Sequence, residues 1–127
     1  MTDTAAQTIL HAWHLEAGAS MAEFGGFDMP IQYDSIFAEQ LENLGQAGDL
    51  LIAISGSGNS ENVLRAVAVA RRKGMKSVGL TGFDGGRLAK EADLAIVAAS
   101  HHMGRVEDVH TVILHAICYY FMEEVSP

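Results

Sequence analysis

Three serines, Ser55, Ser57 and Ser60, follow directly after an apolar run from Leu50 to Ile54. Glycine and asparagine separate them, so hydroxyl groups and unblocked backbone N–H groups lie close together, and both donate hydrogen bonds to anions. The apolar run predicts a buried strand, and the stretch from Val63 to Lys73 predicts a helix whose N-terminus adds partial positive charge. A strand, a polar loop and a helix in this order predict an anion site in an α/β protein.

The charge around this loop leaves two interpretations open. No lysine or arginine lies between Asp49 and Asn62, so a phosphate here would be held by neutral donors and the helix dipole. The same serines also fit an ordinary strand–helix turn in which hydroxyl groups cap the helix. The spacing of the serines does not decide between phosphate binding and capping.

Two further residues, Glu107 and His110, have a spacing that places both on one face of a helix, as in carboxylate metal sites. Two ligands from one helix do not close a metal site, so a symmetry mate would have to complete it. The favoured interpretation is a solvated first turn in which Glu107 and Asp108 interact with the helix dipole. His115 lies among apolar residues and is interpreted as packed or hydrogen-bonded rather than as a working base.

The elements that must position these residues alternate along the second part of the chain. We expect strands over residues 50–54, 76–81 and 94–98, and helices over residues 36–44, 61–73, 87–92 and 105–124. This order predicts an α/β fold, an open parallel sheet of at least three strands with right-handed crossovers and helices on both faces. Loops 55–60, 81–86 and 100–104 should then open on one edge of the sheet, where such folds bind ligands. Before this region, residues 4–19 predict a helix.

Composition excludes several classes of function. The chain has 127 residues and a formal net charge of −8, which argues against binding a nucleic-acid backbone. No apolar run approaches the ~20 residues of a membrane span, and no signal peptide is recognisable. Cys118 is the only cysteine; it cannot form an internal disulfide, so we expect a cytoplasmic protein with a buried, inert thiol.

Three ordered motifs resemble a known family. They are GDLLIAISGSGNS at residues 48–60, GMKSVGLTGFDGG at residues 74–86 and RVEDVH at residues 105–110. They are similar to the SIS (sugar isomerase) domain, specifically to the phosphoheptose isomerase branch, and the resemblance runs from about Tyr33 to Glu124. It implies a three-layer α/β sandwich, usually a tetramer, that takes a small sugar phosphate such as sedoheptulose 7-phosphate.

The resemblance also implies roles for individual residues. It places the phosphate at Ser55, Gly56, Ser57 and Ser60; many members have threonine where Gly56 stands. It implies that Glu107 and His115 are metal ligands, with zinc as the metal, and catalytic residues, with His115 taking part in proton transfer between C1 and C2 of the sugar. Many isomerases have glutamine at the position of Glu107, so zinc binding and water binding both stay open for this residue.

The first third departs from this pattern. Family members carry another strand and a His-x-x-x-Glu pair upstream, and neither is recognisable here: His11 and Glu16 are five residues apart, which turns them ~140° from each other on a helix. Residues 14–33 are instead similar to the start of the glycine cleavage T-protein. We therefore expect residues 1–33 to be a segment of separate origin, a chimera natural or constructed, and residues 34–127 to be the SIS-like domain.

Two hypotheses of function follow. The first is a sugar-phosphate-binding SIS-type domain that binds more readily than it catalyses, because the upstream acid–base pair is missing. The alternative is a shortened folding unit without ligand or activity, stabilised by homo-oligomerisation, because three strands leave a sheet edge and apolar surface to cover. Both hypotheses expect a homo-oligomer, a dimer or a tetramer.

Overall fold

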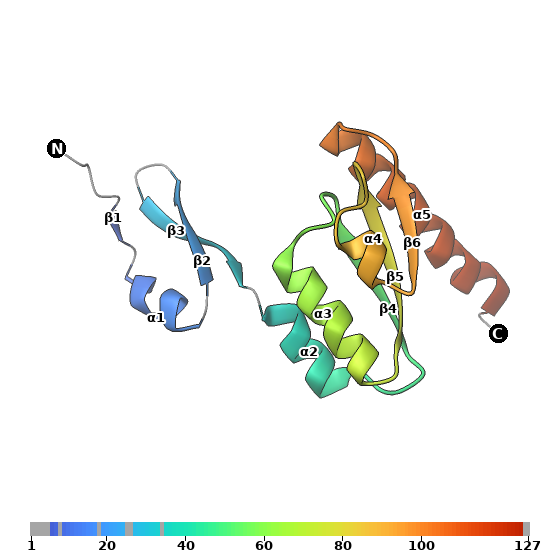
Figure 1. Ribbon diagram of the computed structural model, residues 1–127, viewed down its shortest axis with the longest axis horizontal. Helices are drawn as coiled ribbons and strands as arrows, with labels where there is room; N and C mark the ends of the chain where they lie inside the picture. Colours follow the sequence, from blue (N-terminus) through green and yellow to red (C-terminus); the bar gives the residue numbers. More distant parts are fainter. Residues whose placement is uncertain (1–5, 8, 18, 25–26, 34, 126–127) are drawn as a thin grey trace.

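The computed structural model describes residues 6–7, 9–17, 19–24, 27–33 and 35–125 (Figure 1). Within these residues the strands form two separate three-stranded sheets, one in the first 33 residues and one in the remainder of the chain. Helix α2 (Ile36–Leu44) follows the first sheet and leads into the second.

The first sheet contains β1 (Ala6–Gln7), β2 (Ala19–Phe24) and β3 (Phe27–Tyr33), in the order β1-β3-β2. Strands β2 and β3 are antiparallel, and β1 is parallel to β3. Helix α1 (His11–Glu16) is short. The expected helix over residues 4–19 is therefore wrong at Ala6–Gln7 and at Ala19, while residues 4, 5, 8 and 18 lie outside the described residues. Pairing with β3, which local helix periodicity does not reveal, decides the conformation of these residues.

The second sheet has the predicted parallel architecture. Strands β4 (Leu50–Ser55), β5 (Lys76–Gly82) and β6 (Leu94–Ala98) are parallel and lie in the order β4-β5-β6. Helix α3 (Glu61–Arg72) connects the first two strands and α4 (Leu88–Glu91) precedes the third. The predicted strands and connecting helices are confirmed to within one or two residues at each end.

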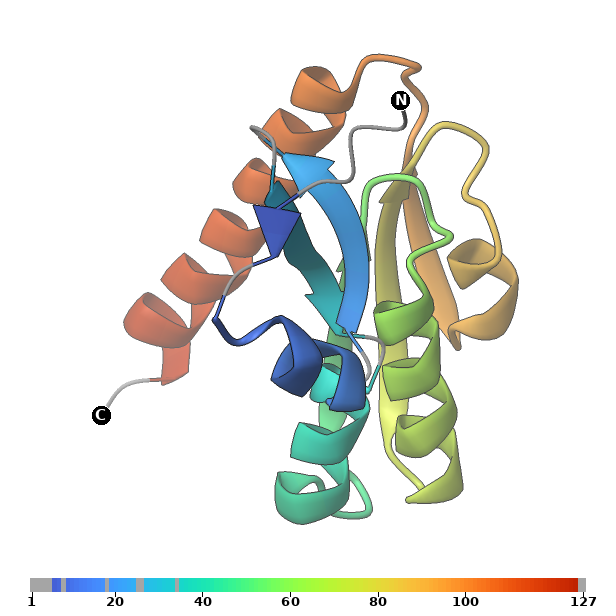
Figure 2. The same cartoon turned by 90° about the vertical axis from the view of Figure 1, so that its left-hand side faces the viewer.

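Helices cover the two faces of this sheet unequally. Helices α3 and α4 lie on one face, and α5 (Met103–Tyr120) crosses the other (Figures 1 and 2). The core lies on the α3 side, where apolar side chains are almost completely buried: Ala53, Val63, Leu64, Val67 and Leu88. The α/β fold with helices on both faces is thus confirmed, and its packed centre lies on one of those faces.

Helix α2 packs against α3, and a lysine fixes its C-terminal end. The Lys73 ammonium donates to the backbone oxygens of Leu41 at 3.1 Å and Glu42 at 2.6 Å. Carbonyl groups near a helix C-terminus lack some of their intrahelical donors, and a cation there also interacts favourably with the dipole. This contact holds the C-terminal end of α2 against the C-terminal end of α3.

Helix α5 differs from the expectation in its burial. It ends at Tyr120 and continues as a π-helical turn over Phe121–Val125. Val106 and His110 are its buried residues, whereas Cys118 is exposed. The expectation of a buried thiol is therefore wrong, because an apolar sequence around Cys118 does not ensure that another element covers that part of the helix.

Candidate functional site at the serine loop

The turn formed by residues 55–60, here named the serine loop, connects β4 to α3 at the carboxyl end of the sheet. Three backbone hydrogen bonds hold it: Gly58 N–H donates to Ser55 O at 2.9 Å, Gly82 N–H to Gly56 O at 2.9 Å, and Leu88 N–H to Gly58 O at 2.8 Å. Two of these bonds come from Gly82 at the end of β5 and from Leu88, the first residue of α4. The loops that follow the two strands therefore support each other at one edge, as the sequence predicted.

Two glycines allow these loops to approach each other. Gly58 has φ +68°, and a Cβ there would lie 2.1 Å from the carbonyl oxygen of Gly85. Gly86 has φ +55°, and its Cβ would lie 2.6 Å from the Ser57 carbonyl oxygen. Both positions combine a left-handed backbone with contact to another backbone, which only glycine tolerates. The glycines thus fix the shape of the serine loop.

The two serines at the ends of the loop are brought together. Ser55 Oγ and Ser60 Oγ are 2.9 Å apart and hydrogen-bonded, with Ser55 buried and Ser60 partly exposed. Ser57 is exposed, and its Oγ accepts a hydrogen bond from Asn59 N–H at 3.2 Å. Ser60 occupies the N-cap position of α3 but its side chain makes no capping bond. The capping interpretation is therefore wrong for Ser60.

A backbone donor set accompanies these hydroxyl groups. Glu61 and Asn62 begin α3, and the N–H groups of a first helical turn have no acceptor within their own helix. They lie next to the Ser60 hydroxyl in the chain, at the positive end of the helix dipole. The arrangement can donate hydrogen bonds to the oxygens of an anion at the end of β4.

Gly56 leaves room for a side chain of α5 to pack against the loop. A Cβ at this position would lie 2.5 Å from Sδ of Met103, the first residue of α5. Because Met103 is a flexible and partly exposed side chain, a larger residue at position 56 would require it to move. The glycine therefore keeps α5 close to the serine loop.

A cation that sequence analysis did not connect to the loop lies beside it. Arg87 donates its backbone N–H to Asn59 Oδ1 at 3.1 Å, and its guanidinium group pairs with Glu61 at 3.0 Å and Glu91 at 3.1 Å. The hydrogen bond to Glu61, followed by the charge of Glu91, raises the pKa of Arg87. Because Arg87 and Glu61 are 26 residues apart, no local motif joins them.

Glu107 and His110 of α5, which the sequence analysis placed on one helix face, have different surroundings in the structure. His110 is buried, and its Nε2 lies 3.2 Å from the backbone oxygen of Thr81 in β5. Glu107 is exposed, and its backbone oxygen accepts a hydrogen bond from Thr111 Oγ1 at 2.9 Å. The Glu-x-x-His pair therefore does not converge: His110 supports the strand, and Glu107 faces solvent.

Comparison with known proteins places this geometry in a family. The sequence profile of the SIS domain matches residues 6–82, more than half of the chain. The chain belongs to the SIS-domain family. The chain is 46% identical to the phosphoheptose isomerase of Sulfurimonas denitrificans over 93 residues, which are 73% of this chain and 48% of that protein. It is 48% identical to the phosphoheptose isomerase of a Nitratiruptor species over 86 residues, 68% of this chain and 46% of that protein.

Solved structures agree with this assignment. The phosphoheptose isomerase of Neisseria gonorrhoeae superimposes with a TM-score of 0.66 and 38% identity, covering 68% of this chain and 48% of that chain. The enzyme of Francisella tularensis gives 0.65 and 36%, covering 68% and 47%. The SIS domain described here thus spans about half the length of the relatives that it matches. Among its described residues, no helix combines the length and apolar content needed to cross a bilayer.

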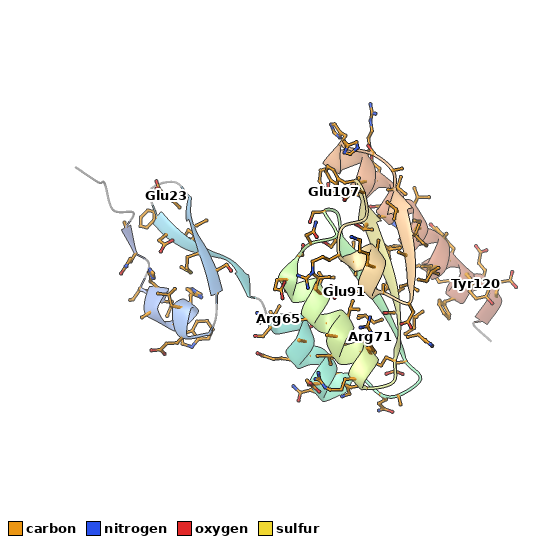
Figure 3. The ribbon with its side chains drawn as sticks, in the orientation of Figure 1. Glu23, Arg65, Arg71, Glu91, Glu107 and Tyr120 are labelled. Carbon is orange, nitrogen blue, oxygen red and sulfur yellow. The ribbon has the colours of Figure 1, made fainter. Side chains whose placement is uncertain are left out.

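The implied zinc ligands do not fit one metal ion within a single copy of the SIS domain. Glu107 and His115 are eight residues apart on α5, which separates them by about 12 Å along the helix axis. His115 is exposed, with its ring 6.4 Å from the Tyr119 ring, so the packed interpretation of His115 is wrong. Within the described ranges, no three His, Cys, Asp or Glu residues form a metal-binding group. Figure 3 shows Glu107 near the carboxyl edge of the sheet and Tyr120 at the opposite end of α5.

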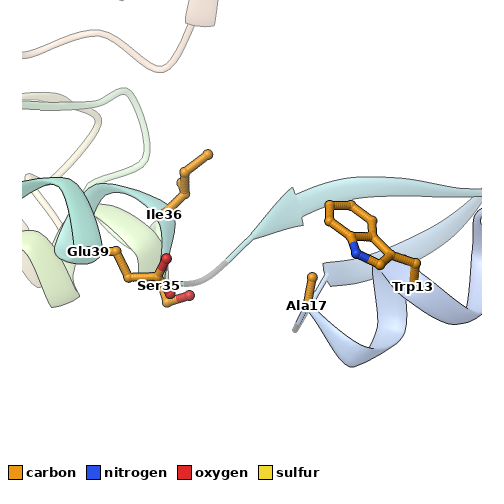
Figure 4. Close-up of a pocket in the computed structure, with 5 residues that line it drawn as sticks. All are labelled: Trp13, Ala17, Ser35, Ile36 and Glu39. Carbon is orange, nitrogen blue, oxygen red and sulfur yellow. The ribbon is translucent and has the colours of Figure 1, made fainter.

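A separate pocket of about 400 Å³ lies between the first sheet's region and α2. Trp13 and Ala17 line one side, and Ser35, Ile36 and Glu39 line the other (Figure 4). None of these residues belongs to the serine loop, and none of them is a cation. The pocket therefore lies apart from the serine loop, and the carboxylate of Glu39 disfavours an anion there.

Proposed function

We propose that this SIS domain binds a sugar phosphate, with its phosphate group at the serine loop. The observation that carries the proposal is the paired hydroxyls of Ser55 and Ser60, 2.9 Å apart, at the N-terminus of α3. The relatives named above are phosphoheptose isomerases, which supports a heptose phosphate as the ligand. The sugar would extend from the loop along the carboxyl edge of the sheet.

Neutral donors would do most of the binding. Ser55, Ser57 and Ser60 offer hydroxyl groups, and the first turn of α3 offers N–H groups and the helix dipole. Arg87 is already held by Glu61 and Glu91, so a phosphate would have to compete with two carboxylates for its guanidinium group. Given the formal net charge of −8, we expect affinity to depend on these local donors and to fall with added salt only weakly.

The residues of this chain support isomerisation less well than they support binding. Isomerisation requires a base that moves a proton between adjacent carbons and a group that stabilises the enediolate. Glu107 lies at the correct edge, but His115 lies two turns further along α5, and neither fits a zinc ion within one copy. Zinc would supply charge stabilisation if a second copy contributed ligands. We therefore propose that a single copy binds the sugar phosphate without isomerising it.

The alternative function, a ligand-free folding unit that persists as a homo-oligomer, is favoured by a specific observation. An apolar hollow of about 530 Å³ lies between the sheet and α5, lined among others by Ile52, Ile96 and Tyr120. Such a surface is typical of an interface between subunits. Binding and association are compatible, so each is tested by its own measurement.

Thermal melting with sedoheptulose 7-phosphate tests the binding proposal. At about ten times the dissociation constant, a ligand of the folded state stabilises by roughly 1.4 kcal/mol, and sedoheptulose without phosphate should not. Ser60→Ala should lose most of this shift. Ser35→Ala is the matched control, because Ser35 also occupies an N-cap without a side-chain capping bond and should keep the shift.

Two results would contradict the proposal. One is a melting temperature of the unsubstituted protein that stays constant up to millimolar sugar phosphate. The other is an equal response of Ser60→Ala and Ser35→Ala, which would place the ligand elsewhere.

A further inference from the structure

Strand β4 forms an edge of the parallel sheet, and its free backbone groups can be identified. Lys76 N–H donates to Asp49 O at 2.9 Å, so the backbone of residue 49 points towards β5. Because these directions alternate along a strand, the N–H and C=O groups of Leu50, Ile52 and Ile54 point away from β5. Within the part of the chain that the structure describes, β4 pairs with β5 alone.

This edge lacks the features by which proteins prevent strand pairing. Proline, lysine and bulges usually protect edge strands, whereas the run from Leu50 to Ile54 is apolar throughout. Leu50 is 59% exposed and Ile54 is 41% exposed. A second hollow, of about 190 Å³, lies on the opposite face of β4 and is lined by Phe37, Leu51 and Ala66 among others. Apolar hollows therefore border β4 on both faces.

The C-terminal half of α5 projects past this edge. In Figure 2, α5 crosses the sheet obliquely, and its C-terminal end lies beyond the green strand β4, on the side away from β6. Leu50 and Ile52 of β4 line the same hollow as Tyr120 and Phe121. Residues 109–122 contain no Asp, Glu, Lys or Arg. A long helix without charged side chains is suited to burial on more than one side.

We infer that the occupant of this edge is a second copy of the chain, with the two β4 strands paired antiparallel about a two-fold axis. The longest pairing places Ile52 opposite the same residue of the second copy, and Leu50 of each copy opposite Ile54 of the other. The two sheets become one continuous six-stranded sheet. Both α5 helices then lie on the same face, and each covers the hollow beside β4 of the other copy.

A second copy fits this surface better than an unrelated partner because the surface complements itself. The symmetric pairing satisfies the free N–H and C=O groups of both strands at once. Each copy carries a formal net charge of −8, so two copies approach most favourably where carboxylates are absent. The strand run and residues 109–122 provide such a surface.

The exposed apolar area at this edge is also close to what a stable dimer interface requires. Leu50, Ile54, Tyr120, Phe121 and Met122 are between 41% and 66% exposed. At about 150–250 Å² for each fully buried aromatic side chain, and somewhat less for the aliphatic ones, they expose on the order of 600 Å² together. The strand backbones and flanks of α5 add to this, which approaches the roughly 800 Å² that each subunit contributes to a standard interface.

Sedimentation velocity of the full chain over a range of concentrations tests the inference. We expect a dimer, and we expect Leu50→Lys and Ile54→Glu each to raise the dissociation constant roughly tenfold or more, a change of about 1.4 kcal/mol. The double variant should restore the dimer, because the introduced lysine of each copy would then lie opposite the introduced glutamate of the other. Leu94→Lys is the matched control: Leu94 begins β6, is 57% exposed and should leave the dimer intact.

Far-UV circular dichroism checks that every variant is folded. A monomer at all concentrations, equal dissociation by Leu94→Lys, or a double variant that stays monomeric would each overturn the proposed pairing. These outcomes are independent of sugar-phosphate binding, because none of the substituted residues belongs to the serine loop.

Discussion

The apolar side chains on the two sides of the parallel sheet are buried very differently. On the α3 side, Val67 and Leu88 are 1% and 0% exposed. On the α5 side, Ile96 lines an open hollow, and Leu94, which shares its face through the alternation of side chains along β6, is mostly exposed. Strands of a parallel sheet are apolar on both faces because both faces are normally covered, and in this chain one of the two is closely packed.

The same difference explains where the candidate site is rigid. The serine loop is tied by backbone hydrogen bonds to the end of β5 and to the first residue of α4. Helix α5, which carries Glu107 and His115, lies on the open face. We therefore expect the phosphate-binding half of the site to be formed in a single copy, and the half expected to hold a metal to depend on what covers the open face.

The largest effect should come from a substitution that breaks the packed face. Leu88→Ala removes a fully buried side chain and should lower the free energy of unfolding by about 3 kcal/mol. Leu94→Ala, on the open face, should cost about 0.5 kcal/mol. Urea denaturation at one fixed protein concentration measures both. Equal losses would mean that the two faces are equally packed and would remove the contrast.

A smaller effect should come from the glycines that connect the loops above the packed face. Gly58→Ala places a Cβ against the backbone of Gly85 and should cost roughly 2 kcal/mol, through strain and displacement of the loop. Gly48→Ala is the control, because Gly48 also has a positive φ but has no atom within 4 Å of its Cβ position. It should cost about 1 kcal/mol. A larger loss for Gly48→Ala would show that the loops are not closely packed.

The smallest effect concerns the amino end of the sheet and depends on pH. Asp93 accepts hydrogen bonds from Ser77 Oγ at 2.7 Å and Ser77 N–H at 2.9 Å, which lower its pKa below the ordinary 3.8. Its ionised form therefore stabilises the fold above pH 3.8, and this contribution is lost as the pH falls through the lowered pKa. Asp93→Asn should melt earlier at neutral pH, and the difference should close in acid. A constant difference across this range would contradict the assignment.

Local patterns were sufficient for the second sheet. The apolar runs that became β4, β5 and β6 each end in a polar or glycine-rich turn, and the helix between β4 and β5 has acidic and basic ends that match its dipole. The serine loop was predictable for the same reason, since its residues are consecutive. The parallel topology predicts that the loops containing Gly58 and Gly85 lie at the same edge of the sheet. It does not predict that their backbones are in contact.

The remainder depends on contacts that are distant in sequence. Ala19 to Phe24 form a strand because β3 lies beside them, and the helical periodicity of residues 4–19 gives no sign of that partner. Arg87 reaches Glu61 only after β5 has returned the chain to the same edge. The exposure of Cys118 and His115 could not be predicted either. Periodicity shows which residues of a helix are apolar, but their burial depends on what packs against α5.

The central claim, that a sugar phosphate binds at the serine loop, is tested most directly by the backbone amide spectrum of the ¹⁵N-labelled protein. Titration with sedoheptulose 7-phosphate should shift the amide signals of Gly56 to Asn62 and of the neighbouring turn after β5, while the signals of α2 and of the first sheet stay in place. Unchanged amides over residues 56–62 at millimolar ligand, or shifts gathered around Trp13 and Glu39 instead, would contradict it.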